Sequence, residues 1–296
     1  MTQLLDEPKT ANIHFSDEVI RLTRAHWQAM GNHLLGPGTE KGMLEMLDEG
    51  RAEEEIATVA NYVPFDLERR RLLEIGCGVG MSQLVARQKG ILAYGIEPGP
   101  GVTVGKRLLQ DHGFDPDTVV NGAGERLPFP DGSFDVVCSF QVLEHTRSPR
   151  RVLAETVRVL KPGGYFVHVF PNYGSFWEGH YGVPWIPHLP KSLGRIYIRL
   201  LGRDLSMINE LQLLTHGQVE RILRKHPDVR ITDFGFDLWE RRLRTLEFSE
   251  WAHLGKVKWA VRWLHRLRLV NLMVLLGRVF HFETPIVLVG TKVESK

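Results

Sequence analysis

The chain has 296 residues, of which 43% are hydrophobic and 24% are charged, and its formal net charge at pH 7 is +2. This composition is typical of a soluble globular protein, and the near-neutral charge gives no general indication of a nucleic-acid or acidic partner. Cys77 and Cys138 fit no disulfide framework and the first residues lack a secretory signal, so we expect a cytoplasmic protein.

The N-terminal segment from residue 16 to about residue 63 carries the apolar spacing of helices, with a break at the GPG of residues 36–38. We therefore expect residues 1–65 to form a helical cap that precedes the main domain.

From residue 71 onward, short apolar runs alternate with helix-length segments. The runs RLLEIG, ILAYGIEP, TVVN, FDVVCSF and GYFVHVF lack internal polar alternation, which is typical of parallel strands covered on both faces. The pattern predicts an α/β, doubly wound domain over residues 66–296. Two insertions interrupt it, an aromatic, Pro- and Gly-rich segment at 171–213 and a basic segment at 238–282.

The stretch EIGCGVG, residues 74–80, follows the first predicted strand and opens a helix. Its glycines allow a tight turn and a close approach of ligand to backbone. The dinucleotide fingerprint G-x-G-x-x-G is not met, because Met81 occupies the position of its third glycine. A carboxylate at Glu74 would repel a phosphate and hold an ammonium group. The alternative is that Glu74 only caps the strand end.

This stretch resembles the first motif, E/D-x-G-x-G-x-G, of the class I S-adenosylmethionine-dependent methyltransferases. The resemblance implies that S-adenosylmethionine is the cofactor and that Glu74 engages its amino group. It also implies a Rossmann-like seven-stranded sheet whose last strand, residues 285–292, inserts antiparallel. Independently of the resemblance, Glu97 ends the second strand, where a carboxylate can accept ribose hydroxyls.

Residues 122–145 are similar to the G-D-A-E-x-L-P-F-x-D-x-S-F-D-V-V run of methyltransferases of the ubiquinone and menaquinone biosynthesis type. In this family the loop covers the adenine, but Ala123 replaces the family's adenine-contacting aspartate, which leaves backbone contacts. The resemblance implies a cofactor site formed by Glu74, Gly76, Cys77, Gly78, Gly80, Glu97, Pro98, Gly124, Glu125 and Gln141. Structural roles are expected for Asp135, for His168 and for the KPGG turn of residues 161–164.

The insertion at 171–213 follows the fifth strand, so it emerges at the edge of the sheet where ligands bind. Methyl transfer to oxygen needs a base, and histidine is the commonest one. We predict His180 as the base, with Tyr181 and Glu178 as neighbours that orient it or the substrate. His145 belongs either to the wall of the active site or to the start of a helix. Alternatively, the insertion folds on its own aromatic cluster and backbone carbonyls satisfy its histidines. No spacing of His, Cys and carboxylates predicts a metal site.

Residues 256–280 place Lys258, Arg262 and Arg266 at helical spacing, with tryptophans on the neighbouring face. Such a helix contacts a membrane surface or an amphiphilic substrate, or it packs its tryptophans on the domain and leaves a solvated basic face. No nucleic-acid-binding fold accompanies the bases.

These observations predict a cytoplasmic, S-adenosylmethionine-dependent methyltransferase that acts on a small or lipid-like acceptor, most readily at oxygen. Methylation of nitrogen or carbon is the alternative within the same cofactor chemistry. A noncatalytic cofactor-binding or membrane-surface module is the alternative from a different class.

Overall fold

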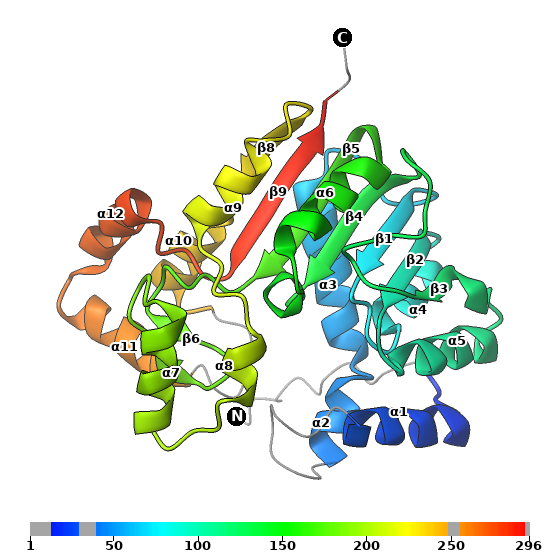
Figure 1. Cartoon of the computed structure of the whole chain (residues 1–296), viewed down its shortest axis with the longest axis horizontal. Helices are drawn as coiled ribbons and strands as arrows, with labels where there is room; N and C mark the ends of the chain where they lie inside the picture. The colour runs from blue at the N-terminus through cyan, green and yellow to red at the C-terminus, as the bar shows by residue number, and fades with distance from the viewer. Residues whose placement is uncertain (1–12, 30–39, 248–254, 294–296) are drawn as a thin grey trace, which may run out of the picture.

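The computed structural model describes residues 13–29, 40–247 and 255–293. A seven-stranded sheet crosses the molecule in the order β3-β2-β1-β4-β5-β9-β8 (Figure 1). β9 runs antiparallel to β5 and β8, and the other strand pairs are parallel. This confirms the predicted fold class, including the antiparallel last strand. The strands are β1 Arg71–Ile75, β2 Leu92–Glu97, β3 Val119–Asn121, β4 Phe134–Phe140, β5 Leu160–Phe170, β8 Val229–Asp233 and β9 Ile286–Lys292.

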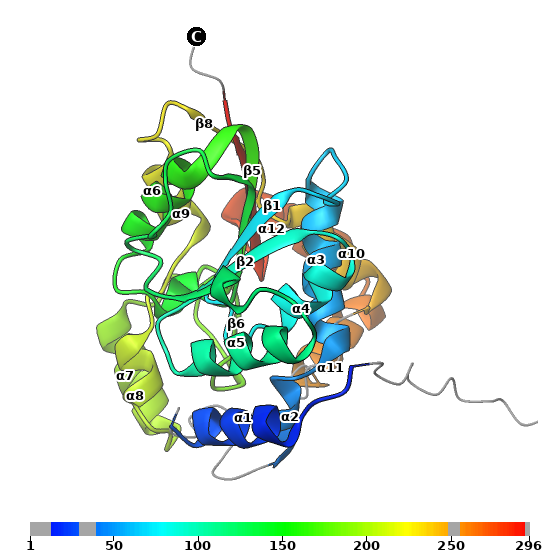
Figure 2. The ribbon, with the colours of Figure 1, turned by 90° about the vertical axis from the view of Figure 1, so that its right-hand side faces the viewer.

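Helices cover both faces of the sheet, because both faces of its strands are apolar. Leu72 packs into one core and its neighbour Leu73 into the other. Figure 2 shows the two layers on opposite sides of the sheet. The first core takes residues from α3 Glu49–Tyr62, α4 Met81–Gln88 and α5 Gly101–Asp111, and the second from α6 Pro149–Val159 and α9 His216–Leu223. Short 3-10 turns lie at η1 Pro116–Thr118 and η2 Leu143–His145.

The N-terminal segment forms α1 Asp17–Ala29, α2 Glu40–Glu45 and α3. The Asp48 side chain begins α3 by accepting a hydrogen bond from the Arg51 backbone N–H. α1 packs on α5 and α3 packs on α4, so their apolar residues join the core of the sheet. The GPG predicted to break this segment lies outside the described residues. The helices therefore cover the side of the domain on which the glycine turn lies.

Asp135 and His168 have the structural roles predicted from the sequence. The Asp135 carboxylate accepts hydrogen bonds from Lys161 Nζ and from the Arg71 backbone N–H, both at 2.9 Å, and so joins the starts of three strands. His168 is fully buried in β5 and its ring nitrogens contact two hydroxyl side chains. Gly163 has a φ of +76°, as the predicted turn requires.

The first insertion has a small core of its own. It contains β6 Trp177–Glu178, β7 Val183–Pro184, α7 Lys191–Leu200 and α8 Ser206–Glu210. Tyr173, Trp185 and Ile198 are buried together between these elements. The insertion thus folds on its own aromatic cluster, which was one of the two expectations for it.

The second insertion contains α10 Phe236–Thr245, α11 Gly255–Arg266 and α12 Val270–Phe280. The basic residues 255–280 form two helices, α11 and α12, and the chain turns between them through Arg268, which has a φ of +56°. Of the two alternatives for the tryptophans of residues 256–280, the one in which they pack on the domain does not hold for Trp259 and Trp263. Trp259 is 62% exposed and Trp263 is 42% exposed, because α11 turns Val261 toward the core instead. In the described residues no helix combines the length and the apolar character needed to cross a membrane.

Candidate functional site

The turn after β1 is held against β2 by one carbonyl group. Ile96 O accepts hydrogen bonds from the backbone N–H groups of Gly76, at 2.8 Å, and Cys77, at 3.2 Å. Gly80 N then donates to Cys77 O at 2.9 Å, which closes the turn into α4. The three glycines of the motif all have positive φ, which side chains rarely adopt.

Gly78 and Gly80 differ in what surrounds them. A Cβ on Gly80 would stand 3.0 Å from the Gly105 Cα of α5, so Gly80 is needed for helix packing. A Cβ on Gly78 would meet no atom within 4 Å. Gly78 is therefore the glycine of the turn that faces open space, where a ligand can approach the backbone.

Glu74 lies beneath this turn and is almost completely buried. Its carboxylate accepts one side-chain hydrogen bond, from Gln83 Nε2 at 2.6 Å. Burial raises the pKa of Glu74 to about 8, and the nearby Glu55 carboxylate adds to the increase. A cationic ligand group beside Glu74 would offset this cost, so the site fits a ligand that carries an ammonium group.

Glu97 ends β2 and joins the glycine turn to the following loop. Its carboxylate oxygens accept hydrogen bonds from the backbone N–H groups of Gly78, at 3.2 Å, and Gly99, at 3.1 Å. Burial raises its pKa although these two bonds act in the opposite direction. A carboxylate has about four lone-pair positions, so Glu97 can accept further donors from a ligand.

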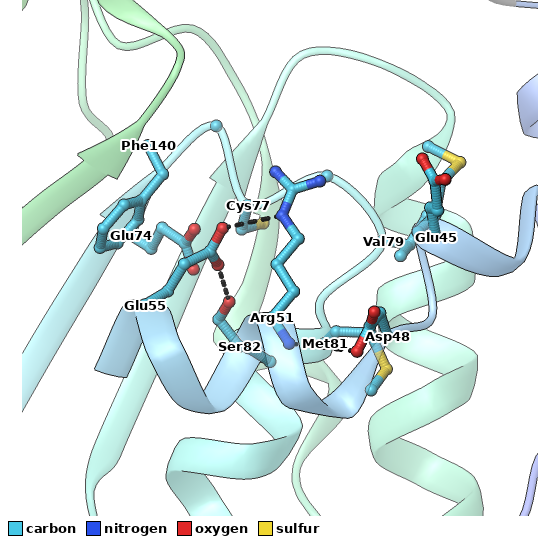
Figure 3. Close-up of a pocket in the computed structure, with 14 residues that line it drawn as sticks. Glu45, Asp48, Arg51, Glu55, Glu74, Cys77, Val79, Met81, Ser82 and Phe140 are labelled. Atoms are coloured by element: carbon cyan, nitrogen blue, oxygen red, sulfur yellow. Dashed lines mark hydrogen bonds and ion pairs between the residues drawn. The ribbon is translucent and has the colours of Figure 1, made fainter. Parts of the chain in front are cut away.

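A pocket lies between the glycine turn and α3, and the sequence did not indicate its outer wall (Figure 3). The Glu55 carboxylate of α3 accepts hydrogen bonds from Arg51 Nε, at 3.1 Å, and Ser82 Oγ, at 2.6 Å. Glu74 and Cys77 line the opposite wall. Helical spacing predicts α3, but nothing in the spacing shows that its charged side chains lie over the turn.

His26 is a second residue that sequence reasoning missed. Its ring lies within 4 Å of the positions that Cβ atoms on Gly99 and Gly101 would occupy, next to the loop after β2. Burial lowers the pKa of His26, and its Nδ1 has no hydrogen-bond partner among the described residues. The amphipathic pattern of α1 predicts a helix and gives no signal for this position.

The predicted adenine loop has a mixed role. A Cβ on Gly124 would stand 2.7 Å from Ile75 Cγ2, so this glycine is needed for packing. Glu125 Oε1 accepts hydrogen bonds from Arg147 N and Ser148 N, which fixes the start of α6. Ala123 of this loop is exposed, as is Pro98 in the separate loop after β2. Contacts of this loop with a ligand must therefore use mainly its backbone.

The loop after β4 connects the glycine turn to the first insertion. It begins at Gln141, which has a φ of +56° and whose N–H donates to Val169 O at 2.7 Å. The Val142 side chain packs over Gly76, where a Cβ would stand 2.4 Å from Val142 Cγ2. Val142 O accepts a hydrogen bond from His145 N at 2.9 Å. Only two residues, Leu143 and Glu144, thus lie between the turn contact and His145.

The insertion places a buried carboxylate at its centre. Glu178 accepts hydrogen bonds from the Tyr173 hydroxyl at 3.1 Å, from His180 Nδ1 at 2.8 Å and from Tyr181 N at 2.6 Å. His180 is therefore held by a carboxylate and not by a backbone carbonyl. The alternative in which backbone carbonyls satisfy the histidines of the insertion therefore does not describe His180.

His145 and His180 meet although they are far apart in sequence. Their Nε2 atoms are 3.2 Å apart and their rings are nearly perpendicular. Burial is the largest single influence on His180 and lowers its pKa, but the hydrogen bond to Glu178 and the negative charges of Glu178 and Glu144 together outweigh burial, so the pKa is raised. Burial and the adjacent His180 lower the pKa of His145 to about 4. Glu144 is also close, with Oε1 4.0 Å from His145 Nε2, and burial raises its pKa to about 7.

The side chains of Tyr181 and His188 lie outside this cluster. The Tyr181 hydroxyl donates to Asp204 O at 2.7 Å and accepts from Ile208 N at 3.0 Å, so it fixes α8. Tyr181 reaches Glu178 only through its backbone. The His188 ring lies beside Gly174. The fold therefore brings together His180, Glu178 and His145 from the predicted set.

Residues 73–168 match the protein family described as a methyltransferase domain. This region is a class I, S-adenosylmethionine-dependent methyltransferase domain. S-adenosylmethionine is accordingly its cofactor, and the space at Gly78 and the buried Glu74 carboxylate fit such a ligand.

Three curated relatives are similar to part of the chain. An uncharacterized methyltransferase of Mycobacterium avium is 35% identical over 38% of this chain and 42% of its own length. A probable chloroplastic tocopherol O-methyltransferase of Oryza sativa is 36% identical over 40% of this chain and 33% of its own length. Norajmaline N-methyltransferase of Rauvolfia serpentina is 29% identical over 49% of this chain and 53% of its own length. The chain thus spans between a third and about half of these relatives.

We expect Gly78→Ala to weaken S-adenosylmethionine binding roughly tenfold, because its methyl group would occupy the open side of the methyltransferase turn. Gly80→Ala is the matched control. Both variants bear the strain of a positive φ, about 1–2 kcal/mol, but Gly80→Ala must also displace Gly105. Calorimetric titration should show the larger loss of affinity in Gly78→Ala, and thermal unfolding the larger loss of stability in Gly80→Ala. Unchanged affinity in Gly78→Ala would contradict the assignment.

Glu74→Gln should change the pH dependence of stability in the cofactor-free protein. Because the folded pKa of Glu74 is about 8, above its ordinary 4.5, the folded chain keeps a proton that the unfolded chain loses between these values. Wild-type stability should therefore fall as pH rises through this window, by roughly 1.4 kcal/mol for each pH unit. Glu74→Gln should lack this decrease and bind S-adenosylmethionine more weakly. Chemical unfolding at pH 5 to 8 measures both slopes, and parallel slopes would refute the interpretation.

Proposed function

We propose that the protein transfers the methyl group of S-adenosylmethionine to an oxygen atom of a small or lipid-like acceptor. The observation that carries the proposal is the His180 imidazole, which the buried Glu178 carboxylate holds beside His145. His145 in turn ends the loop that packs on the glycine turn. The names of two relatives, a tocopherol O-methyltransferase and a norajmaline N-methyltransferase, support a small-molecule acceptor.

S-adenosylmethionine supplies a methyl group already activated on its sulfonium, so the protein has mainly to bind and align the reactants. In this proposal Glu74 holds the ammonium group and Glu97 accepts the ribose hydroxyls with its free lone pairs. Gln141 lies at the methionine end. The backbone supplies the other proposed cofactor contacts, at Gly76, Cys77, Gly78, Gly80, Pro98, Gly124 and Glu125.

The acceptor oxygen must lose its proton, and the proposal assigns this step to His180. Its Nδ1–H donates to Glu178, which fixes the tautomer in which Nε2 carries the lone pair. Nε2 then takes the proton and the Glu178 carboxylate stabilises the imidazolium that forms. Tyr173 and the Tyr181 backbone hold Glu178 in place. His145, beside Nε2, forms the wall of the acceptor position.

Methyl transfer to nitrogen or carbon is the second reading of the same site. One relative carries the name of an N-methyltransferase, which favours keeping this alternative. A nitrogen acceptor with a free lone pair needs no base, so His180 would then matter much less for the rate.

The direct test is incubation with methyl-labelled S-adenosylmethionine and an extract of the source organism, followed by identification of the labelled product. With that acceptor, His180→Ala and Glu178→Gln should lower kcat at least about 100-fold, the usual contribution of a general base. His188→Ala is the matched control and should stay within about threefold of wild type. Full turnover by His180→Ala would reject the base and favour nitrogen or carbon transfer.

A noncatalytic module is the alternative from a different class, and Ala123 is the departure from the family pattern that favours it. It predicts that S-adenosylmethionine binds and that no extract component becomes labelled. The same incubation, run beside a calorimetric titration, separates the two functions.

For the location of the protein, we propose a cytoplasmic chain that contacts anionic membrane surfaces through the α11–α12 hairpin. Large apolar side chains are exposed along both helices, including Trp259, Trp263 and Phe280. Residues 255–282 contain no acid, and Arg262 and Arg266 are exposed beside the tryptophans. Tryptophans and bases on one surface match the headgroup region of an anionic bilayer.

The full chain should therefore sediment with vesicles that contain anionic lipid, and high salt should weaken this binding. Replacing Trp259 and Trp263 with Ser should lower the bound fraction at least about tenfold, because both rings leave water when the hairpin binds. Leu193 and Ile196 of α7 are also exposed, so their double Ser variant is the control and should bind like wild type. No sedimentation of wild type, or equal binding by both variants, would reject the proposal.

A further inference from the structure

Glu144 is a buried carboxylate that accepts no hydrogen bond from the residues that the structure describes. The residue is 0% exposed, and neither carboxylate oxygen has a hydrogen-bond partner in the described part of the chain. An uncompensated buried carboxylate is costly unless a cation approaches it. Its Oε1 lies 4.0 Å from His145 Nε2, so it faces the histidine pair.

The geometry of the two imidazoles matches that of neighbouring metal ligands. Their Nε2 atoms are 3.2 Å apart and their planes cross at 79°. Two nitrogens bound to one tetrahedral Zn²⁺ at about 2.0–2.1 Å are about 3.4 Å apart. The Glu178 carboxylate holds His180 Nδ1 and leaves Nε2 toward His145, an arrangement that is typical of metal-binding histidines.

We propose that Glu144, His145 and His180 bind one divalent transition-metal ion of the Zn²⁺ class. Their ligand atoms lie within 4.8 Å of one another. Two imidazole nitrogens and one carboxylate oxygen leave a coordination position open, and His145 lies at the partly exposed side of the cluster. No local spacing indicated this site, because His180 lies in the insertion, 35 residues after His145 in the chain.

The use of the ion in catalysis rests on the proposed function. An acceptor hydroxyl bound at the open position loses its proton to water more readily, because the ion stabilises the oxygen anion. The same Nε2 of His180 cannot both coordinate the ion and take the proton, so the base role proposed above belongs to the ion-free protein, and with the ion bound His180 is a ligand. Glu178 then orients a ligand through the same hydrogen bond.

A second cluster of the same residue types provides a control. His216, His281 and Glu283 also lie together, but the rings of His216 and His281 are stacked at 3.8 Å with an angle of 24° between their planes. The nitrogen lone pairs lie in the ring planes, so stacked rings cannot both point at one ion. His216 Nδ1 already contacts the Glu283 carboxylate.

The test is titration of the chelator-stripped full chain with Zn²⁺ in competition with a chromophoric chelator. Wild type and His281→Ala should each bind one equivalent. Glu144→Gln and His180→Ala should lose at least about 100-fold in affinity, and Glu178→Gln about 10–100-fold. Circular dichroism and S-adenosylmethionine binding, measured on the same samples, show which variants remain folded.

Absence of Zn²⁺ binding by wild type would overturn the proposal, as would unchanged affinity in folded Glu144→Gln and His180→Ala or its loss in His281→Ala. Failure of this inference and failure of the proposed function are distinguishable. Methyl transfer by a wild type that binds no Zn²⁺ rejects the ion site alone, whereas Zn²⁺ binding without labelled product rejects the transferase function alone. Methyl transfer that survives removal of bound Zn²⁺ rejects only the use of the ion in catalysis.

Discussion

The Ile96 carbonyl group, which accepts both Gly76 N–H and Cys77 N–H, is the interaction on which the site depends. It forces the chain to reverse direction directly at the end of β1, within the hydrogen-bond network of β2. Such a turn needs positive φ, and the glycines provide it. Once the turn is fixed, Gly78 N–H points at Glu97, so the ends of two strands are joined by one carboxylate.

The same constraint extends to the acceptor side. Since Gly76 has no side chain, Val142 can pack directly on the turn, and its carbonyl holds His145. The first insertion has its own core, yet it is connected to this loop at two points. Gln212 N donates to Glu144 O at 2.7 Å, and His180 meets His145. The fold thus couples a methyltransferase cofactor turn to a separately packed insertion through one short loop.

Local patterns were sufficient to predict the parallel strands and the glycine turn, because each depends on neighbours within one strand-turn-helix unit. The antiparallel last strand followed only from the resemblance to the methyltransferase family. Structural roles were also predicted for Asp135 and His168, although Asp135 joins the starts of three strands. The positions of Glu55 and His26 could not be predicted, because they depend on how the N-terminal helices pack across the sheet. The exposure of Trp259 and Trp263 was left open for a related reason. Helical periodicity defines two faces but does not say which one finds a partner.

Three buried carboxylates lie at the glycine turn and at the histidine pair, and they differ in the hydrogen bonds that compensate their charge. They are Glu74, Glu144 and Glu178. Glu178 accepts hydrogen bonds from several donors, so it is stable without a ligand and can act as a fixed orienting group. Glu74 has one side-chain donor, from Gln83, and Glu144 has none among the described residues. Because a buried carboxylate without donors is costly, the deficit indicates where a cation belongs. Glu74 lies at the glycine turn and Glu144 at the histidine pair, so the molecule is best compensated when cations occupy both positions at once.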